Sequence, residues 1–395
     1  PHLLDTIPEV VYPIERYNKA LKIINPHSWG AFVNSDLTRA SIGISSKDVL
    51  SNLLLYAGAE YDIQEKTTTI KTQASLQTLY PIIDGSFNLS HRTVRVADSL
   101  DIITAVSGPD TTRVKQNIDF SWQEKNAELG MRLPFNLTRS RFFTQVNFGM
   151  SGGLTSVSKF KNSFDNGGRI ISQNLPQYFF RDYQDNGRLV YGKFGITAYN
   201  LMRKSPRDIN SRWGQVLLMH ASTSMNIFSD NFKGAQFSSV GYLYAPGLLP
   251  HHSLWGYGGY QFTQINWRDV DNYIFRGNIP TPRGATIQRY ENIYTYSGNY
   301  TFPVFYPDVA IGPLAYIKRV RANAFIDGAF GQNTQLAEIT GRVQETLYMS
   351  TGAEIKLDMN LIRLLPQFDF GVRFSQVMLP KKSFVVEVLV GTINF

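Results

Sequence analysis

The sequence contains no cysteine. A thiol nucleophile, a disulfide framework and thiolate metal sites are therefore all excluded. Charged residues make up only 18% of the chain, below the roughly one quarter that is usual in soluble domains. No apolar run reaches the roughly 18 residues that a membrane-spanning helix requires. These absences leave a chain with little charge that cannot cross a membrane by helices.

Aromatic residues and glycine are abundant, with 26 Phe, 21 Tyr and 31 Gly. That composition is typical of many tall strands joined by tight turns and flanked by aromatic girdles. The net charge is +8, but the 39 Lys and Arg residues are scattered and form no long basic run. This distribution argues against nucleic-acid binding. We interpret the excess as lining of a polar lumen and as contact with membrane lipid, including acidic head groups.

Apolar and polar residues alternate with period two in segment after segment, which is the pattern of β-strands. Residues 347–361 show it best, because Ile355 and Leu357 fall on one face and Glu354, Lys356 and Asp358 on the other. The segments are longer than soluble strands, and a tilted strand needs about 9–11 residues to cross a bilayer. Their polar faces carry charges, as expected of a water-filled lumen.

The pattern therefore predicts an all-β transmembrane antiparallel barrel of about sixteen strands in a bacterial outer membrane. The strands are expected at 38–46, 50–62, 67–79, 82–95, 113–123, 125–135, 141–152, 187–199, 215–228, 234–246, 255–267, 291–304, 315–329, 345–361, 365–377 and 382–395. Residues 1–37 are interpreted as a periplasmic lead-in segment and residues 38–395 as the barrel. Two connections, 96–112 and 200–214, come out unusually long for the periplasmic side.

The start of the chain, Pro1-His2-Leu3-Leu4-Asp5, has no basic segment before an apolar one and so is not a signal peptide. A barrel requires export, and we therefore expect the chain to be a mature form or a piece of a longer protein.

No enzymatic site, cofactor site or metal site is predicted. Residues 149–153 match the Gly-x-Ser-x-Gly spacing of a hydrolase, but they follow an amphipathic strand and precede a Thr/Ser/Gly loop instead of a helix. His251 and His252 are adjacent in sequence, with no carboxylate cluster nearby, and are assigned to a turn.

The last segment ends Leu389-Val390-Gly391-Thr392-Ile393-Asn394-Phe395. A terminal aromatic on an apolar strand looks like the closing-strand signal that outer-membrane assembly machinery reads in its clients. Leu389, Ile393 and Phe395 are the residues assigned to that signal. The physical basis is an exposed strand edge whose N–H and C=O groups can pair with another sheet.

The last third resembles the barrel of the outer-membrane assembly factor and two-partner-secretion transporter superfamily, also called bacterial surface antigens. The resemblance rests on an Arg-Gly pair in the long connection near 268–290, on the strand end Asn299-Tyr300-Thr301-Phe302-Pro303, and on Phe325-Ile326-Asp327-Gly328. The Arg-Gly pair is either Arg276-Gly277 or Arg283-Gly284, and neither is followed by the family's aromatic residue. Gly328 lies one residue earlier than in the family pattern.

The resemblance implies that this connection folds into the lumen and that Asp327 holds Arg276 or Arg283. The alternative from the residues alone is that Asp327 pairs with Arg319 or Arg321 in its own wall, since these three share one polar face.

His27-Ser28-Trp29 in a Tyr-containing lead-in is also similar to the barrel ends of larger envelope proteins that carry a β-propeller. Three functions stay open: insertion or export of outer-membrane proteins, alone or as a subunit of a machine with other envelope proteins; a passive pore for small solutes; and an anchor for a periplasmic domain.

Overall fold

The computed structural model describes residues 26–33, 39–62, 67–107, 110–164, 187–225, 232–264, 273, 275–285, 287, 290–334, 343–361 and 368–392. The described residues form a single antiparallel sheet with 17 strands, which confirms the all-β prediction and the expected strand count of about sixteen. Among the described residues, no helix is long and apolar enough to cross a membrane.

The strand bounds are β1 Pro26–Val33, β2 Arg39–Lys47, β3 Leu53–Asp62, β4 Thr67–Leu76, β5 Ile82–Ser107, β6 Asp110–Asn136, β7 Phe142–Phe164, β8 Gly187–Met202, β9 Gly214–Ser224, β10 Ala235–Pro246, β11 Ser253–Thr263, β12 Asn292–Phe305, β13 Val309–Ile311, β14 Ala315–Asn333, β15 Gln344–Leu361, β16 Phe368–Leu379 and β17 Ser383–Thr392.

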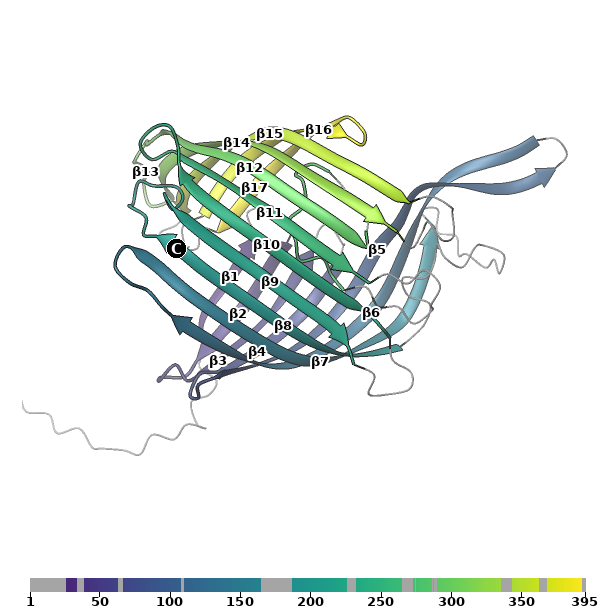
Figure 1. Ribbon diagram of the computed structural model, residues 1–395, viewed down its shortest axis with the longest axis horizontal. Coiled ribbons are helices and arrows are strands. Elements are labelled where there is room, and N and C mark those ends of the chain that lie inside the picture. The colour runs from purple at the N-terminus through teal and green to yellow at the C-terminus, as the bar shows by residue number, and fades with distance from the viewer. Residues whose placement is uncertain are drawn as a thin grey trace, which may run out of the picture.

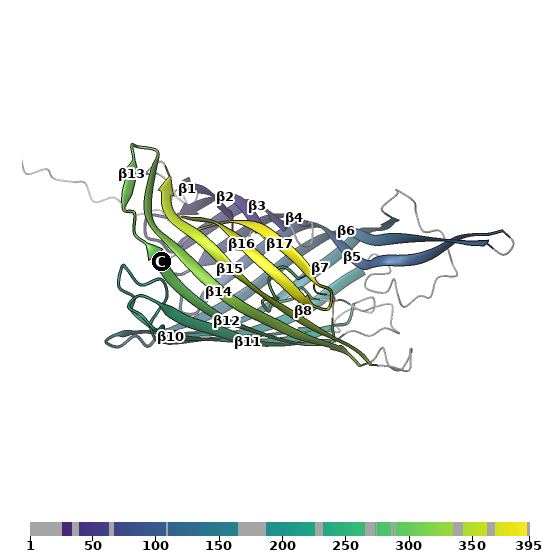
Figure 2. The ribbon, with the colours of Figure 1, turned by 90° about the horizontal axis from the view of Figure 1, so that it is seen from above.

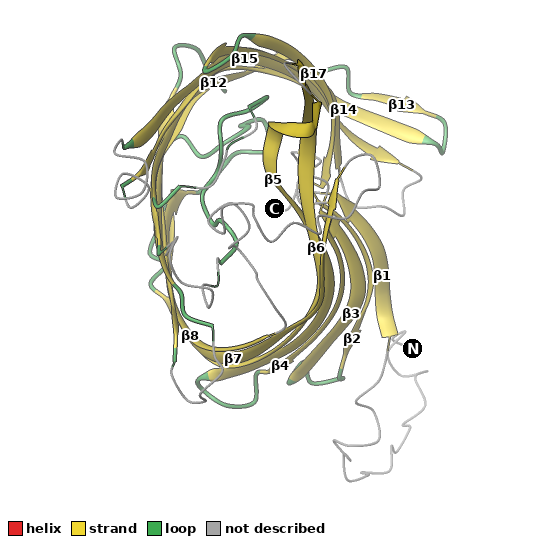
Figure 3. Ribbon diagram, turned by 90° about the vertical axis from the view of Figure 1, so that its right-hand side faces the viewer, coloured by secondary structure: helices red, strands yellow, loops and turns green. Residues whose placement is uncertain are grey.

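Each strand pairs with the next one in the chain, except that β12 pairs with β14 and the short β13 pairs only with β14. Figure 1 and Figure 2 show the tilted strands wrapped around a central axis, and Figure 3 views the ring along that axis. The first and last strands, β1 and β17, lie next to each other. Within the described ranges no ladder joins them, so the ring meets itself at a seam there.

The connections sort into two ends. One end, the turn side, carries 48–52, 77–81, 137–141, 203–213, 247–252 and 306–314, and it also receives the start of β1 and the end of β17. The other end, the loop side, carries the long connections 165–186 and 264–291. In outer-membrane barrels short turns lie in the periplasm and long loops outside the cell. By this rule the turn side corresponds to the periplasmic side.

The sheet is inverted relative to a soluble protein. Large apolar side chains point outward and stay exposed, as for Leu129 at 67% and Ile355 at 50%, whereas Asp327, Asp358 and Ser375 on the inner face are 0% exposed. An apolar outer band and a polar interior suit a strand that has lipid on one side and a lumen on the other. The alternation read from residues 347–361 is thus found in β15.

Two strand assignments from the sequence are wrong and offset each other in the count, and the short β13, which was not expected, brings the total to 17. The expected strands 113–123 and 125–135 are one continuous strand, β6. A strand inside the expected lead-in, β1, pairs with β2 from Ser28 opposite Ser45 to Val33 opposite Ala40, so the sheet begins at Pro26 instead of residue 38. Residues 1–25 of the lead-in lie outside the described residues.

The structure also removes one of the two anomalous connections and shortens the other. Residues 96–107 and 110–112 belong to β5 and β6, which continue past the barrel on the loop side as a two-stranded ribbon. Figure 2 shows this ribbon as the projection at the right. The second anomaly shortens to 203–213, because β8 runs to Met202. Continuity of β6 also fixes its phase, and Trp122 lies inward at 0% exposure.

Candidate functional site: the lumen loop and its charge ladder

The long connection between β11 and β12 folds into the lumen, as Figure 3 shows for the loop segments inside the ring. Tyr273 of this connection is buried, and its hydroxyl donates to Glu124 Oε1 on β6 at 3.0 Å. The backbone is held from β10 and β11, because the Gln236 side-chain amide donates to the Phe275 carbonyl at 3.3 Å and the Asn278 N–H donates to Gln261 Oε1 at 2.9 Å. The connection is therefore fixed at both walls of the lumen.

The second half of the connection packs on an apolar cluster. Tyr290, Ile293, Ala329 and Tyr348 form this buried cluster, and Ile279, Ala285 and Ile287 of the connection pack against it. Apolar burial of this kind stabilises a loop that would otherwise be surrounded by water-filled space.

Arg283 is the arginine that reaches the wall. Its Nε donates to Asp327 Oδ2 at 2.7 Å and its Nη2 donates to Asp327 Oδ1 at 2.7 Å, which is a bidentate pair. The Arg283 backbone N–H also donates to Asp327, at 3.0 Å. The guanidinium centre lies 3.6 Å from the centre of the Phe325 ring, so it also has a cation–π contact.

The remaining donors of Arg283 are also satisfied. Nη2 donates to Asn299 Oδ1 at 2.8 Å and to Ser297 Oγ at 3.0 Å, and Nη1 donates to Glu354 Oε1 at 3.2 Å. The strands β12, β14 and β15 thus each supply a partner to one side chain. A buried guanidinium with this many partners compensates the cost of removing its charge from water.

Gly284, the next residue, has a backbone φ of +74°, a conformation that favours glycine. A Cβ at this position would lie 2.7 Å from Ser375 Cβ on β16. Both backbone geometry and space therefore require glycine after Arg283. Gly277, after Arg276, has no such constraint, since a Cβ there would meet only Gln261 atoms, at 3.7 and 3.8 Å.

Arg276 lies in a different part of the lumen. It is half-buried, lines the cavity described below, and lies near enough to Glu124 for electrostatic attraction. Of the two arginines named from the sequence, Arg283 contacts Asp327 and Arg276 does not.

The expected wall partners of Asp327 bind other acids. Arg319 contacts Asp358, and Arg321 contacts Asp358 at 2.8 Å and Asp369 at 2.8 Å. The alternative in which Asp327 pairs with Arg319 or Arg321 is therefore wrong. Asp358 lies on β15, where the antiparallel register places it opposite Arg319 of β14. Asp369 lies on the next strand, β16, opposite Asp358.

The pairs join into a continuous ladder of charge across the inner face from β14 to β17. Glu354 accepts from Arg283 and also from Arg373 Nε at 2.7 Å, and Arg373 contacts Glu387 of β17 at 3.2 Å. Lys356 joins Glu354 to Asp369, at 3.8 and 3.3 Å. Networks of this kind in a low dielectric are stronger than isolated surface pairs. The lumen loop is thus connected by charge to the closing strand.

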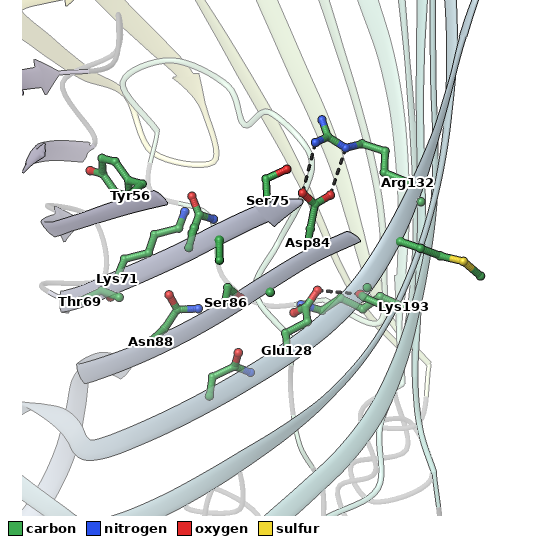
Figure 4. Close-up of a pocket in the computed structure, with 18 of the residues that line it drawn as sticks. Tyr56, Thr69, Lys71, Ser75, Asp84, Ser86, Asn88, Glu128, Arg132 and Lys193 are labelled. Atoms are coloured by element: carbon green, nitrogen blue, oxygen red, sulfur yellow. Dashed lines mark hydrogen bonds and ion pairs between the residues drawn. The ribbon is translucent and has the colours of Figure 1, made fainter. Parts of the chain in front are cut away.

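The other half of the lumen is open. A cavity of about 1280 Å³ lies against β1–β10 and the lumen loop and is lined mostly by hydroxyl, amide and charged side chains. Figure 4 shows part of it, with Asp84 bound to Arg132 and Glu128 bound to Lys193 at 2.6 Å. A polar cavity of this size holds water and small polar solutes. Among the described residues, no group of three or more metal-binding side chains occurs.

The closing strand is only partly described. Leu389 is buried on the inner face, in phase with Glu387, whereas Phe384, Val386 and Val388 form the outward row. The expected signal residues Ile393 and Phe395 lie outside the described residues.

The sequence matches no family model and no curated protein. Solved structures do match. CdiB from Escherichia coli aligns with a TM-score of 0.52 and 12% identity over 92% of this chain. BamA from Haemophilus ducreyi, in a form lacking POTRA domains 1–3, aligns with a TM-score of 0.52 and 12% identity over 91% of this chain. The chain covers 61% of the CdiB chain and 68% of the BamA chain.

The chain therefore shares the β-barrel fold of these CdiB and BamA structures, which is the fold that the resemblance in sequence implied.

Proposed function

We propose that this chain is an outer-membrane barrel that assists the insertion or export of other envelope proteins. The observation that carries the proposal is the seam, where β1 and β17 are neighbours without a ladder between them in the described ranges. Paired strands bury their backbone donors and acceptors in ladders, so a seam presents free N–H and C=O groups to an incoming strand.

In this function the lumen loop is a brace. Arg283 connects the loop to β12, β14 and β15, and the charge ladder continues through Arg373 to Glu387 on β17. The brace keeps the last strands in one arrangement while the seam exchanges partners. Partners are then other envelope proteins whose strands pair at the seam.

A second candidate is a passive pore for small solutes, and the cavity of about 1280 Å³ favours it. The two functions differ in what the seam must do. A pore works with a locked seam, whereas strand exchange requires an open one.

The test is a reversible covalent lock of the seam. Because the chain has no cysteine, introduced thiols are the only ones present. Trp29→Cys in β1 is combined in turn with Val386→Cys and with Val388→Cys in β17, all three exposed on the sheet, and the pair that crosslinks on oxidation is used. The protein is reconstituted in vesicles, and the folding rate of an unfolded outer-membrane barrel added from outside is followed by its heat-modifiable gel mobility.

We expect acceleration of client folding before oxidation, loss of it in the oxidised seam variant, and recovery with reductant. The matched control is Trp29→Cys with Ile44→Cys, which are ladder partners in β1 and β2, so a disulfide there restrains a pair that is already joined. Equal acceleration by the locked and unlocked seam variants would refute the proposal. Steady single-channel conductance that is indifferent to the lock would assign the chain to the pore class.

A further inference from the structure

Three arginines from two connections converge on the turn side of the barrel, outside the lumen site. The Arg203 N–H donates to the Arg141 carbonyl at 2.9 Å, so the connections 137–141 and 203–213 touch. The Phe142 N–H donates to the Arg139 carbonyl at 3.3 Å, which folds Arg139 back beside Arg141. We name Arg139, Arg141 and Arg203 the basic cluster.

The charges of the basic cluster are not neutralised by the protein. All three side chains are exposed, and among the described residues none of them has a side-chain hydrogen bond or ion pair. The acid in the same connection, Asp208, is buried and committed elsewhere, to His251 Nδ1 at 2.8 Å and Arg212 Nε at 3.6 Å. Three like charges close together repel one another. An anion bound beside them offsets that repulsion.

The basic cluster lies at the level where the apolar outer band ends. Tyr80, Phe135 and Phe148 stack edge-to-face on the outer surface, with ring centres 6.3 and 5.9 Å apart, as in the aromatic girdle of a membrane interface. Arg139 follows Phe135 by four positions in the chain.

Two exposed apolar side chains lie in the same connections as the basic cluster. Leu137 and Trp213 are 54% and 55% exposed, and the Trp213 carbonyl accepts from the Met202 N–H, directly before Arg203. Basic residues just outside an aromatic girdle, with exposed Leu and Trp between them, are suited to contact lipid at two depths.

We propose that the basic cluster binds the phosphate of an anionic phospholipid in the turn-side leaflet. Arginine guanidinium groups bind phosphate oxygens in pairs, and two connections supply them from both sides. The neighbouring Leu137 and Trp213 contact the glycerol and upper acyl region, which a soluble anion lacks. This assigns the lipid class, an anionic glycerophospholipid, and the leaflet, the periplasmic one.

The experiment measures lipid binding to the full chain in neutral detergent by native mass spectrometry. The probes are phosphatidylglycerol, phosphatidylcholine and inorganic phosphate. The parent chain is expected to retain phosphatidylglycerol in preference to phosphatidylcholine. Arg139→Gln with Arg203→Gln is expected to weaken phosphatidylglycerol binding about 25-fold, since each basic residue near a lipid surface is worth about fivefold in affinity.

The matched control removes the same charge at the opposite end. Lys381 and Lys382 are exposed in the connection between β16 and β17 on the loop side, and Lys381→Gln with Lys382→Gln is expected to change binding less than about twofold. Arg139→Lys with Arg203→Lys keeps the charge and loses the paired donors, so an intermediate loss is expected. Heat-modifiable gel mobility verifies that each variant is folded.

An equal loss of phosphatidylglycerol binding in Lys381→Gln/Lys382→Gln would overturn the proposal, because net charge alone would then explain the binding. Unchanged phosphatidylglycerol binding in Arg139→Gln/Arg203→Gln would also overturn it. If inorganic phosphate alone binds with the same arginine dependence and displaces the lipid, the site is one for a soluble anion. If polyglutamate binds through these arginines and phosphatidylglycerol does not, the surface serves an acidic protein.

Discussion

Arg283 holds both carboxylate oxygens of Asp327, each at 2.7 Å, although the two residues are separated by a whole strand and its flanking connections. Asp327 is fully buried on β14, and Arg283 is the only loop residue named from the sequence that contacts it in the described part of the chain. The pair holds the lumen loop against β14. Without it, water would separate the loop from the barrel wall.

Removing the guanidinium is therefore expected to release the loop. Arg283→Ala leaves Asp327 and Glu354 without a major partner, and breaking one side of a buried ion pair costs about 3–5 kcal/mol. We expect faster protease cleavage within 264–291 and a lower denaturant midpoint in detergent. Arg276→Ala, in the same loop but half-exposed and distant from Asp327, is the control and is expected to change both far less. Equal cleavage of the two variants would contradict an anchoring role for Arg283.

Gly284 is expected to be intolerant of any side chain. Gly284→Ala adds a Cβ 2.7 Å from Ser375 Cβ in a backbone of positive φ, and the conformational part alone costs about 1–2 kcal/mol. Its denaturant midpoint in detergent should fall accordingly. Gly277→Ala makes the same change with ordinary contacts at 3.7 Å and should leave the midpoint within error. A stable Gly284→Ala protein would show that the loop rearranges at little cost.

The turn side contains a pH-dependent contact. Burial opposes ionisation of Asp208, but its bonds with His251 and Ser205 and the nearby Arg212 together hold its pKa below the ordinary value. A lowered folded-state pKa means that the stabilisation is complete above the unfolded-state value of about 3.9 and is lost as pH falls through the lower folded-state pKa.

Asp208→Asn should therefore lower stability at neutral pH and flatten the loss of stability between about pH 4 and pH 2. The measurement is the unfolding midpoint in detergent as a function of pH. Arg212→Gln is the control, because Arg212 is half-exposed and 3.6 Å from the carboxylate, and it should leave the acid profile nearly unchanged. Parallel acid profiles for Asp208→Asn and the parent chain would contradict this account.

The barrel itself was predictable because period-two alternation is a property of one strand at a time. The inner positions of β15, including Glu354 and Asp358, were on the correct face from residues 347–361 alone. The pairing of those charges was not predictable, since it depends on the register between strands, and the register places Asp358 opposite Arg319. The resemblance brought Arg276 and Arg283 equally to Asp327, and only the three-dimensional path of the loop separates them.

The errors also have physical causes. β1 is short and begins at Pro26, so it contains little alternation to detect. β6 was divided next to Trp122, a large aromatic residue that in the structure packs inside under Arg92, whose guanidinium lies 4.9 Å from the indole centre. On the lumen face the indole N–H of Trp122 donates to Glu124 Oε2 at 3.3 Å, and the Arg92 guanidinium lies over its ring, so a polar interior accommodates this tryptophan.

The charge ladder makes one more prediction, which concerns Asp358. Its side chain is fully buried and accepts from both Arg319 and Arg321, so Asp358→Asn leaves two guanidinium groups with a neutral partner. We expect a loss of about 3–5 kcal/mol in unfolding free energy, measured by urea titration in detergent. The control is Asp84→Asn, which breaks a bidentate pair with Arg132 of similar length, 3.1 Å, but with both side chains about 40% exposed. Exposed pairs are worth about 0–1 kcal/mol, so the two Asp→Asn changes should separate by several-fold. If Asp358→Asn were as mild as Asp84→Asn, water would have to reach the inner face of β14 and β15. The lumen loop held by Arg283 would then not shield that face from water, contrary to what its contacts indicate.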